Sequence, residues 1–418
     1  MGFWNLFANS WIRGSRKPIA GSRNKIKRRS LSLESLEDRT VPTSFINFVD
    51  PNPSAGNGFG TTILSLGSGK VAVTAPYDDF AATDAGAVYV YNGSTGALVS
   101  TIRGSHAGDN LGSDGLFAVG TSSTGNFLIA SPNWDNGSIS NAGALTFVSG
   151  SPASSITVSS ANSLVGSTAG DAVGTGANVK VLTNNNNYVV ASPLWNGTAA
   201  DVGAVTWGSG SSGVVGTISS SNSYVGVTTN DRIGSSGIAA LSNGNYAFAS
   251  PLFDTTVADA GAVTWGDGST GSTGTVATSN SWVGSNPNDN VGSGGLTALT
   301  GNGNFVISSP IWDNYISAES FVSDAGAATW VDGSGASSGV LSSTNSFVGN
   351  TGSDKISSDG VFALTNGNYV ICSSYAEATD VGAVTWSGGI SSTKVTGTVS
   401  NLNSLEGAGL SFSIDRVG

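Results

Sequence analysis

Acidic side chains recur at one place in the repeating pattern of this chain, and a recurring carboxylate could bind a calcium ion. The candidates are Asp109, Asp171, Asp231, Asp289 and Asp354, in contexts such as GDNLGSDG and NDRIGSSG. Calcium takes about six to eight oxygen ligands, and one isolated aspartate per turn supplies too few. An aspartate followed closely by glycine more often caps a turn by accepting backbone N–H bonds. We therefore expect turn-capping carboxylates and no bound cofactor, with weak calcium binding as the alternative.

A second set of candidate site residues is aromatic. Trp134, Trp195, Phe253 and Trp312 each follow a Ser-Pro step by two residues. Rings in such loops could stack on sugars or on peptide side chains, which would make them a ligand-binding rim. The alternative is that each ring folds down over its own sheet and seals the edge.

Few residues suit catalysis. His106 is the sole histidine, so Ser-His-Asp relays and HExxH zinc sites are not expected. Cys372 lies in the apolar run NYVICSS, where we expect an inert buried thiol. Two of the scattered carboxylates could still form a glycosidase pair. We expect a protein that is not an enzyme, with a glycoside hydrolase or lyase that has an acidic central pocket as the alternative.

An internal repeat indicates the elements that position these residues. Close relatives of the heptapeptide DVGAVTW begin at six positions, namely Asp84, Asn141, Asp201, Asp259, Asp324 and Asp380. Their glycines are 57, 60, 58, 65 and 56 residues apart. Asparagine replaces aspartate once at the first position of the heptapeptide. Because asparagine brings no charge, the exchange favours a role in turn geometry over chemistry.

Each period contains four short β-like runs separated by Gly, Asn, Ser and Asp clusters, which is typical of consecutive antiparallel strands. In the third unit the runs are NVKVLT from Asn178, NYVVASP from Asn187, GAVTWG from Gly203 and GVVGTISS from Gly213. Asn-Gly steps such as SNGN at Ser242–Asn245 predict tight type I′ hairpins between the first two strands. Each unit should form one twisted four-stranded sheet.

A sheet repeated six times buries both faces if the sheets stack around an axis. The sequence therefore predicts an all-β fold, a β-propeller of about six four-stranded blades; seven blades or a β-solenoid are the alternatives. The aromatic residues that end the heptapeptide should pack between blades; they are Phe147, Trp207, Trp265, Trp330 and Trp386. The units span residues 45–104, 105–160, 161–220, 221–279, 280–344 and 345–402, with a partial seventh at 403–418.

Charge separates the first 44 residues from the repeats. Nine of the sixteen Lys and Arg residues lie within residues 1–40, although the chain has a net charge of −11. An acidic body without a basic stripe argues against nucleic-acid binding. No apolar run is long enough for a membrane-spanning helix. We expect residues 1–44 to be a basic, disordered arm that precedes a single repeat domain at 45–418.

Two stretches resemble known families. LESLEDRTVP, from Leu33 to Pro42, resembles the LExLExRxxP leader of exported planctomycete surface proteins, which implies export to the cell surface or beyond. The stretch Asn57–Asn92, with Phe59-Gly60 and Ala75-Pro76, resembles the FG-GAP repeats of integrin alpha-chain propellers. It departs from their calcium-binding DxDxDG loop, because LGSGK at Leu66–Lys70 has no acid. The later units also resemble glycine-rich repeats of bacterial surface proteins.

These observations together predict an exported, non-enzymatic β-propeller that mediates adhesion or ligand binding through its rim loops. The expected partner is a surface glycan or a protein, and the expected form is a monomeric ring. A purely structural envelope module is a further alternative.

Overall fold

The computed structural model describes residues 46–151, 155–317, 320–377 and 380–407. The chain divides into two units, Met1–Phe45 and Ile46–Gly418, and the expected basic arm at 1–44 lies outside the described residues. Most of the expected partial seventh unit, residues 408–418, also lies outside them. No helix among the described residues has the length and apolarity to cross a membrane.

The described residues fold into six larger sheets and one hairpin, and neighbouring strands in each sheet are hydrogen-bonded. Sheet one contains β1 (Ile63–Leu66), β2 (Lys70–Ala75), β3 (Ala87–Asn92), β4 (Leu98–Arg103) and β8 (Ile156–Thr157). Sheet two contains β5 (Leu116–Ala118), β6 (Phe127–Ser131), β7 (Ala144–Val148), β9 (Ser163–Val165) and β13 (Gly216–Thr217). Sheet three contains β10 (Val179–Val181), β11 (Tyr188–Ser192), β12 (Ala204–Gly208), β14 (Ser223–Val225) and β18 (Gly274–Thr275).

The second half of the row repeats this pattern. Sheet four contains β15 (Ile238–Ala240), β16 (Tyr246–Ser250), β17 (Ala262–Gly266), β19 (Ser281–Val283) and β25 (Gly339–Val340). Sheet five contains β20 (Leu296–Ala298), β21 (Phe305–Ser309), β24 (Ala327–Val331), β26 (Phe347–Val348) and β30 (Gly397–Thr398). Sheet six contains β27 (Val361–Ala363), β28 (Tyr369–Ser373), β29 (Ala383–Ser387) and β31 (Leu405–Glu406). A hairpin of β22 (Asn314–Ser317) and β23 (Ser320–Val322) and a short 3-10 helix at Gly176–Asn178 complete the elements.

The prediction of an all-β fold with one sheet per unit is confirmed, but the predicted fourth strand is assigned differently. The run from Gly213 contains β13, which leaves its own unit and pairs in parallel with β9 of the preceding sheet. The fourth antiparallel strand of sheet three is β14, at the residues around Tyr224. Each of the first five sheets thus gains a short fifth strand from the next unit, and this strand links neighbouring units.

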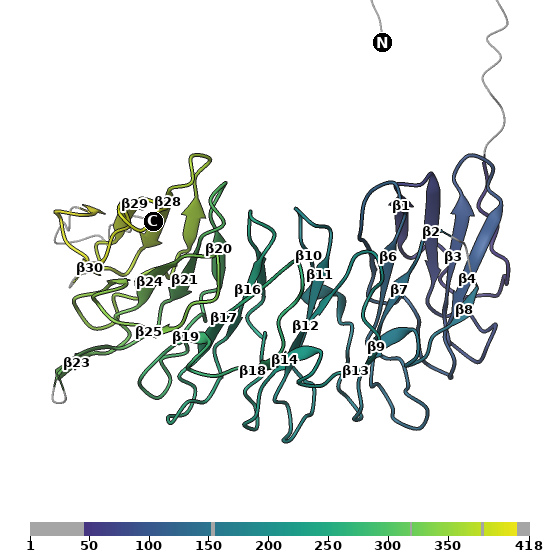
Figure 1. Ribbon diagram of the computed structural model, residues 1–418, viewed down its shortest axis with the longest axis horizontal. Coiled ribbons are helices and arrows are strands. Elements are labelled where there is room, and N and C mark those ends of the chain that lie inside the picture. Colours follow the sequence, from purple (N-terminus) through teal and green to yellow (C-terminus); the bar gives the residue numbers. More distant parts are fainter. Residues whose placement is uncertain (1–45, 152–154, 318–319, 378–379, 408–418) are drawn as a thin grey trace, which may run out of the picture. The chain divides into compact units, whose positions relative to one another are not determined.

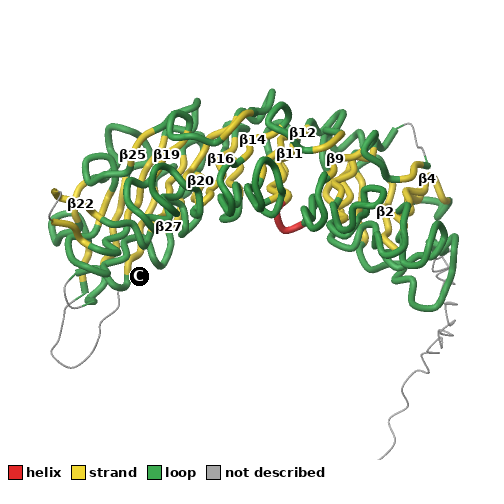
Figure 2. The backbone as a smooth tube through the Cα atoms, turned by 90° about the horizontal axis from the view of Figure 1, so that it is seen from below, coloured by secondary structure: helices red, strands yellow, loops and turns green. Residues whose placement is uncertain are grey.

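The sheets of this unit follow one another in chain order (Figure 1). Sheet one, drawn in purple and blue, and sheet six, drawn in yellow-green, lie at opposite ends of the row in Figure 1 and again in Figure 2. Each period forms one sheet, as expected for a blade, rather than two solenoid coils. The sheets of the described residues do not close into the ring that a β-propeller requires (Figures 1 and 2).

Strand alternation buries both faces of each interior sheet. In sheet three, Tyr188 and Val190 pack with Leu128 and Leu145 of sheet two. The intervening residues, such as Val189, pack toward sheet four. Because successive residues of a strand point to opposite faces, one short strand supplies two separate cores. An interior sheet is therefore apolar on both sides and needs a neighbour on each.

The glycine of the heptapeptide allows a close backbone approach. Gly203 has a φ of 73°, in the left-handed region. A Cβ atom at this position would lie 2.3 Å from the Ile233 backbone nitrogen. Gly203 and Ile233 form a parallel bridge, so any side chain at residue 203 would both strain the backbone and separate the two segments.

Tryptophan and asparagine side chains bind a glycine carbonyl across each junction between sheets three, four, five and six. Trp207 Nε1 donates to the Gly268 carbonyl oxygen at 3.0 Å. Asn185 and Asn187 donate their side-chain amides to the same oxygen, at 2.6 and 2.9 Å. The next two junctions repeat this with Trp265, Asn243 and Asn245 on Gly333, and with Trp330, Asn302 and Asn304 on Gly389. The prediction that these aromatics pack between sheets is confirmed for Phe147, Trp207, Trp265 and Trp330. It is wrong for Trp386, which is 55% exposed because no described sheet follows sheet six.

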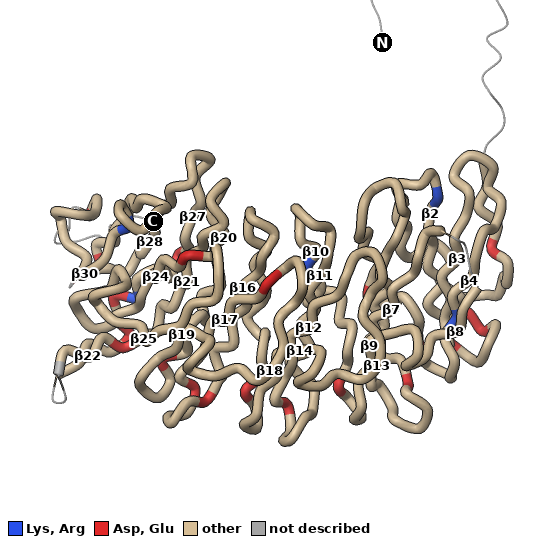
Figure 3. The backbone as a smooth tube through the Cα atoms, in the orientation of Figure 1, with Lys and Arg blue, Asp and Glu red and all other residues tan. Residues whose placement is uncertain are grey.

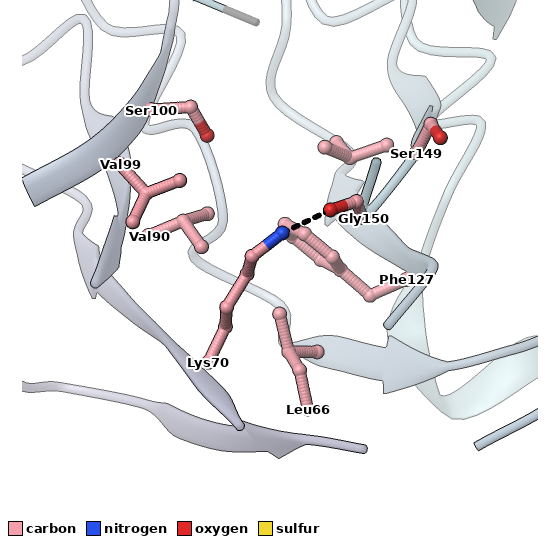
Figure 4. Close-up of a pocket in the computed structure, with 9 residues that line it drawn as sticks. Leu66, Lys70, Val90, Val99, Ser100, Phe127, Ser149 and Gly150 are labelled. Carbon is pink, nitrogen blue, oxygen red and sulfur yellow. Dashed lines mark hydrogen bonds between the residues drawn. The ribbon is translucent and has the colours of Figure 1, made fainter. Parts of the chain in front are cut away.

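The first junction uses a different donor for the same purpose. Lys70 of sheet one donates its Nζ to the Gly150 carbonyl oxygen of sheet two. Figure 4 shows this bond in the small pocket between the two sheets, beside Leu66 and Phe127. The pocket has a volume of about 10 Å³, which is at the lower limit of the space that one water needs, so it is a packing gap rather than a ligand site.

The Asn-Gly hairpins differ from the predicted type I′ turn. Gly244 has a positive φ of 93°, whereas Asn243 is not among the residues with positive φ. Gly244 donates its N–H to the Leu241 carbonyl oxygen at 3.0 Å, which closes a type I turn that is followed by a left-handed glycine. The Asn243 side chain reaches the next sheet instead, so this asparagine is needed for the junction rather than for its own φ.

Candidate functional site

The recurring carboxylates are buried hydrogen-bond acceptors. All five, Asp109, Asp171, Asp231, Asp289 and Asp354, are at most 1% exposed. At Asp231, Oδ2 accepts the backbone N–H groups of Val227 and Thr228, at 2.9 and 2.7 Å. Its Oδ1 accepts the N–H of Asp254 at 3.0 Å. Each carboxylate thus closes its own turn. In Asp109, Asp171, Asp231 and Asp289, Oδ1 also accepts a backbone N–H from the loop after the second strand of the next sheet.

This geometry supports the turn-capping interpretation over calcium binding. Burial raises the pKa of Asp231, and the backbone N–H bonds from Asp254, Thr228 and Val227 partly oppose that rise. A calcium ion would compete with those N–H groups for the same lone pairs and would face their positive ends. Figure 3 shows acidic residues spread along the row, mostly near its lower edge. The described residues contain no group of three or more potential metal ligands.

The second aspartate series occupies left-handed backbone positions. Asp84, Asn141, Asp201, Asp259, Asp324 and Asp380 have φ between 48° and 52°. Asparagine and aspartate tolerate this region better than other residues that carry a side chain. The structure therefore accounts for the exchange at Asn141 by backbone conformation.

The expectation of exposed rim aromatics is wrong, because the four rings are buried. Trp134, Trp195, Phe253 and Trp312 are 2%, 6%, 4% and 2% exposed. Each belongs to a core cluster between two sheets. The alternative, in which the ring folds down and seals the sheet edge, describes all four. They cannot contact a ligand without leaving the core.

The sole histidine lies beside a serine and an aspartate, a grouping that the sequence did not reveal. Ser105 Oγ lies 2.9 Å from His106 Nδ1 and 3.1 Å from Asp109 Oδ2. A hydrolytic relay needs the imidazole between the acid and the nucleophile, with one ring nitrogen bonded to each. Here Ser105 and Asp109 both face Nδ1, and Ser105 Oγ also accepts the indole N–H of Trp134. This cluster is a capped turn.

Cys372 and Glu377 complete the residues considered for chemistry. Cys372 is partly exposed rather than buried as expected. Partial burial raises the pKa of its thiol, and the nearby carboxylate of Asp359 adds to the rise. Partial burial also raises the pKa of Glu377, and the nearby carboxylate of Glu406 adds to the rise. The side-chain amide of Asn350 donates to Glu377 Oε1 at 3.3 Å. Neither residue lines the two hollows described next.

Two hollows along the first strands of the sheets are large enough for part of a ligand. One has a volume of about 350 Å³ and spans three sheets. The other has a volume of about 260 Å³ and lies between β10 and β15. The first is lined by Ser236, Gly237, Ile238, Gly294, Gly295, Leu296, Thr297, Gly360 and Val361. We call it the inner-edge groove, because β15, β20 and β27 are each the edge strand of their sheet.

The groove presents backbone and small side chains. The lining contains four glycines and no charged residue. Thr297 Oγ1 donates to the Val361 carbonyl oxygen at 3.0 Å and so links two neighbouring edge strands. Sequence analysis missed this site because its residues are neither aromatic nor charged. The signal that could have found it is the glycine that precedes the first strand in several units.

Comparison with known families identifies the repeat. A family model described as a repeat of unknown function (DUF5650) matches residues 121–175, 182–235, 240–293, 299–358 and 363–418. The chain belongs to this repeat family. Each DUF5650 match begins at the end of a sheet's first strand or just after it, and the strands of sheet one before β8 lie outside the matches. No curated protein matches the chain.

Proposed function

We propose that this DUF5650 repeat protein is an exported, non-enzymatic binding protein that holds an extended ligand in the inner-edge groove. The resemblance of residues 33–42 to an export leader supports a location at the cell surface. The groove lining supports binding rather than catalysis, because it offers no acid pair, no histidine and no thiol. The ligand contacts then lie on the edge strands β15, β20 and β27 rather than on the buried aromatics.

The observation that carries the proposal is the repetition of one lining across three sheets. Ile238, Leu296 and Val361 are the equivalent apolar residues of β15, β20 and β27, and all three are partly exposed. The edge strands contact one another in the order β10, β15, β20 and β27. A ligand that crosses this edge meets the same surface once per unit, which favours a polymer over a small compact molecule.

Glycines bring the backbone of the groove within reach of such a polymer. Gly237, Gly295 and Gly360 have φ values of 96°, 87° and 104°, and a Cβ atom at Gly237 or Gly295 would meet nothing within 4 Å. The backbone there is therefore not screened by side chains, although the N–H groups of the three glycines already donate within their own turns. A surface polysaccharide fits this lining. Its hydroxyls can hydrogen-bond the Ser236 and Thr297 side chains, and its apolar ring faces can cover the methyl groups of Ile238 and Leu296.

Binding of the full chain to a polysaccharide array, and then to intact cell envelopes, tests the proposal. A double substitution, Ile238→Asp with Leu296→Asp, places two charges in the groove and should reduce binding at least tenfold. Val215→Asp is the matched control, because Val215 is 50% exposed and precedes β13 at the opposite edge of sheet two. Equal binding by all three proteins would reject the groove. No binding by the wild type would favour a purely structural module.

A further inference from the structure

The side of sheet six that faces away from sheet five carries a tryptophan and two asparagines, the same residue types that join the sheets elsewhere in the row. Tyr369, Ile371 and Ala383 pack in the core between sheets five and six. Alternate strand residues point to the opposite face, so the outward residues are those between them. We define the C-terminal face as Val370, Cys372, Val384 and Trp386, with the adjacent turn residues Asn366 and Asn368.

The C-terminal face is uncovered where its equivalents are buried. Trp386 is 55% exposed, whereas Trp330, at the same position of sheet five, is 7% exposed. Val384 is partly exposed, whereas the equivalent Ala328 is 1% exposed. A large aromatic ring that is half exposed beside other apolar residues is typical of an interaction surface rather than of a free sheet side.

The hydrogen bonds define what kind of partner fits. At three junctions, one tryptophan and two asparagines donate to a single glycine carbonyl oxygen. The C-terminal face has the same three donors in Trp386, Asn366 and Asn368, and within the described residues no carbonyl accepts from the Trp386 indole or from these two amides. The fitting partner is a turn that presents a glycine carbonyl.

Sheet one contains such a turn on its own outer side. Residues 93–96 read Gly-Ser-Thr-Gly, the same as residues 268–271 of sheet four. In sheet four, the Gly268 carbonyl receives the three donors, and a Cβ atom at Gly271 would lie 2.9 Å from the Trp207 ring. In the described chain, no donor reaches the carbonyl of Gly93. The two ends of the row thus carry complementary halves of one junction.

A short segment covers the turn of sheet one. A Cβ atom at Gly96 would lie 2.7 Å from the Asn47 carbonyl oxygen and 3.1 Å from Ile46 Cγ2. Ile46 and Asn47 therefore take the place that the Trp207 ring takes in sheet four. This segment forms no strand, and Ile46 and Val49 are 46% and 69% exposed. Phe48 packs on the Tyr91 ring and the Tyr91 hydroxyl donates to the Val49 carbonyl oxygen, and these are the contacts that would be lost if the segment moved aside.

We propose that the C-terminal face binds the outer side of sheet one in a second copy of this chain. Trp386, Asn366 and Asn368 of one copy donate to the Gly93 carbonyl of the other, and residues 46–49 of that copy are displaced. The contact joins unlike surfaces, so repeating it builds head-to-tail rows or closed rings of copies. The covering segment 46–49 competes with this contact and weakens it.

Sedimentation velocity of the full chain over a wide concentration range tests the association. The average mass of the wild type should rise with concentration, and Trp386→Ala should abolish the rise. Phe48→Ala, which loosens the covering segment, should shift association to at least threefold lower concentration. Phe321→Ala is the control, since Phe321 is 53% exposed on a separate hairpin, and it should behave as wild type. A monomer at every concentration for both the wild type and Phe48→Ala would overturn the proposal.

Disulfide trapping tests the orientation and does not depend on the Trp386 variant. In a Cys372→Ser background, one copy carries S94C and another carries N368C. Mixing the two under mild oxidation should give a disulfide-linked pair of unlike copies. Cross-linking of N368C copies only to one another would show a tail-to-tail contact and overturn the proposal. The absence of any cross-link would also overturn it, and would favour coverage of the C-terminal face by residues 408–418.

Discussion

The two end sheets of the row differ in how they treat the side that has no neighbouring sheet. On sheet one, Tyr89 stands where the other five units have threonine. Tyr91 stands where they have glycine, serine or valine. Both tyrosines are 1% exposed. Phe48 packs on the Tyr91 ring with their centroids 5.1 Å apart. On sheet six the ordinary repeat residues remain, and Trp386 is 55% exposed.

The comparison indicates that the outer side of sheet one is modified and covered by residues 46–49, whereas the described outer side of sheet six keeps the ordinary repeat residues. A repeat that is apolar on both sides needs either a neighbour or a modified outer face. The covered side of sheet one has such a modified face in Tyr89 and Tyr91. The strands of that sheet before β8 lie outside the DUF5650 matches. Sheet six keeps the ordinary repeat residues on its outer side, as the contact proposed above with a second copy requires.

The largest expected effect separates the two equivalent tryptophans. Trp330→Ala should reduce the free energy of unfolding by about 3–5 kcal/mol, because it removes a buried ring and leaves a cavity between two sheets. Trp386→Ala should change it by about 0.5 kcal/mol or less, as is usual for exposed positions. Urea unfolding measures both values. A similar loss for the two variants would mean that the side of sheet six is covered in solution.

A smaller difference is expected between two of the buried carboxylates. Asp231→Ala should cost about 3 kcal/mol, since three backbone N–H groups lose their acceptor. Asp354→Ala should cost about 1 kcal/mol less, because Oδ1 of Asp354 accepts the Thr351 hydroxyl, which can turn to another acceptor. Urea unfolding midpoints with unchanged m-values would measure the gap. Equal costs would show that the bond from the Thr351 hydroxyl stabilises the fold as much as the bond from the Asp254 N–H.

The cap itself should contribute modestly. Tyr91→Phe removes the hydroxyl that donates to the Val49 carbonyl oxygen at 2.8 Å and should cost about 1 kcal/mol. Hydrogen exchange of the β3 amides should become faster in this variant and stay unchanged in Val49→Ala, whose side chain is 69% exposed. Unchanged exchange in Tyr91→Phe would show that residues 46–49 do not hold the end of the row.

The smallest expected effect concerns calcium. Added calcium should leave the thermal midpoint unchanged within about 1 °C, because the recurring carboxylates already accept backbone N–H bonds. The measurement is a melting curve with calcium and another with a chelator. A rise of several degrees would contradict the turn-capping role and would place a cation at the turns of Asp109 and its equivalents.

Much of the local structure could be predicted from the sequence. The spacing of the DVGAVTW relatives predicted one sheet per unit, and the Asp-to-Asn exchange at residue 141 predicted a turn role for the first residue of the heptapeptide. The type I′ turn at Ser242–Asn245 was wrong because the Asn243 side chain bonds to the next sheet. The sequence left open whether Trp134 is exposed or buried, and it did not reveal the inner-edge groove, since loop residues and edge strands acquire their surroundings from other units.

The sequence by itself determined the period, the all-β class and the turn role of Asn141 and its equivalents, because strand alternation and left-handed turn preferences depend on residues that are near one another in the chain. Tertiary structure alone decided that β13 joins the preceding sheet, that the rim aromatics are core and that Trp386 is uncovered while Trp330 is buried. These outcomes depend on which segments meet across a junction. Identical residues in two units therefore have different environments, and only the presence of a neighbouring sheet distinguishes them.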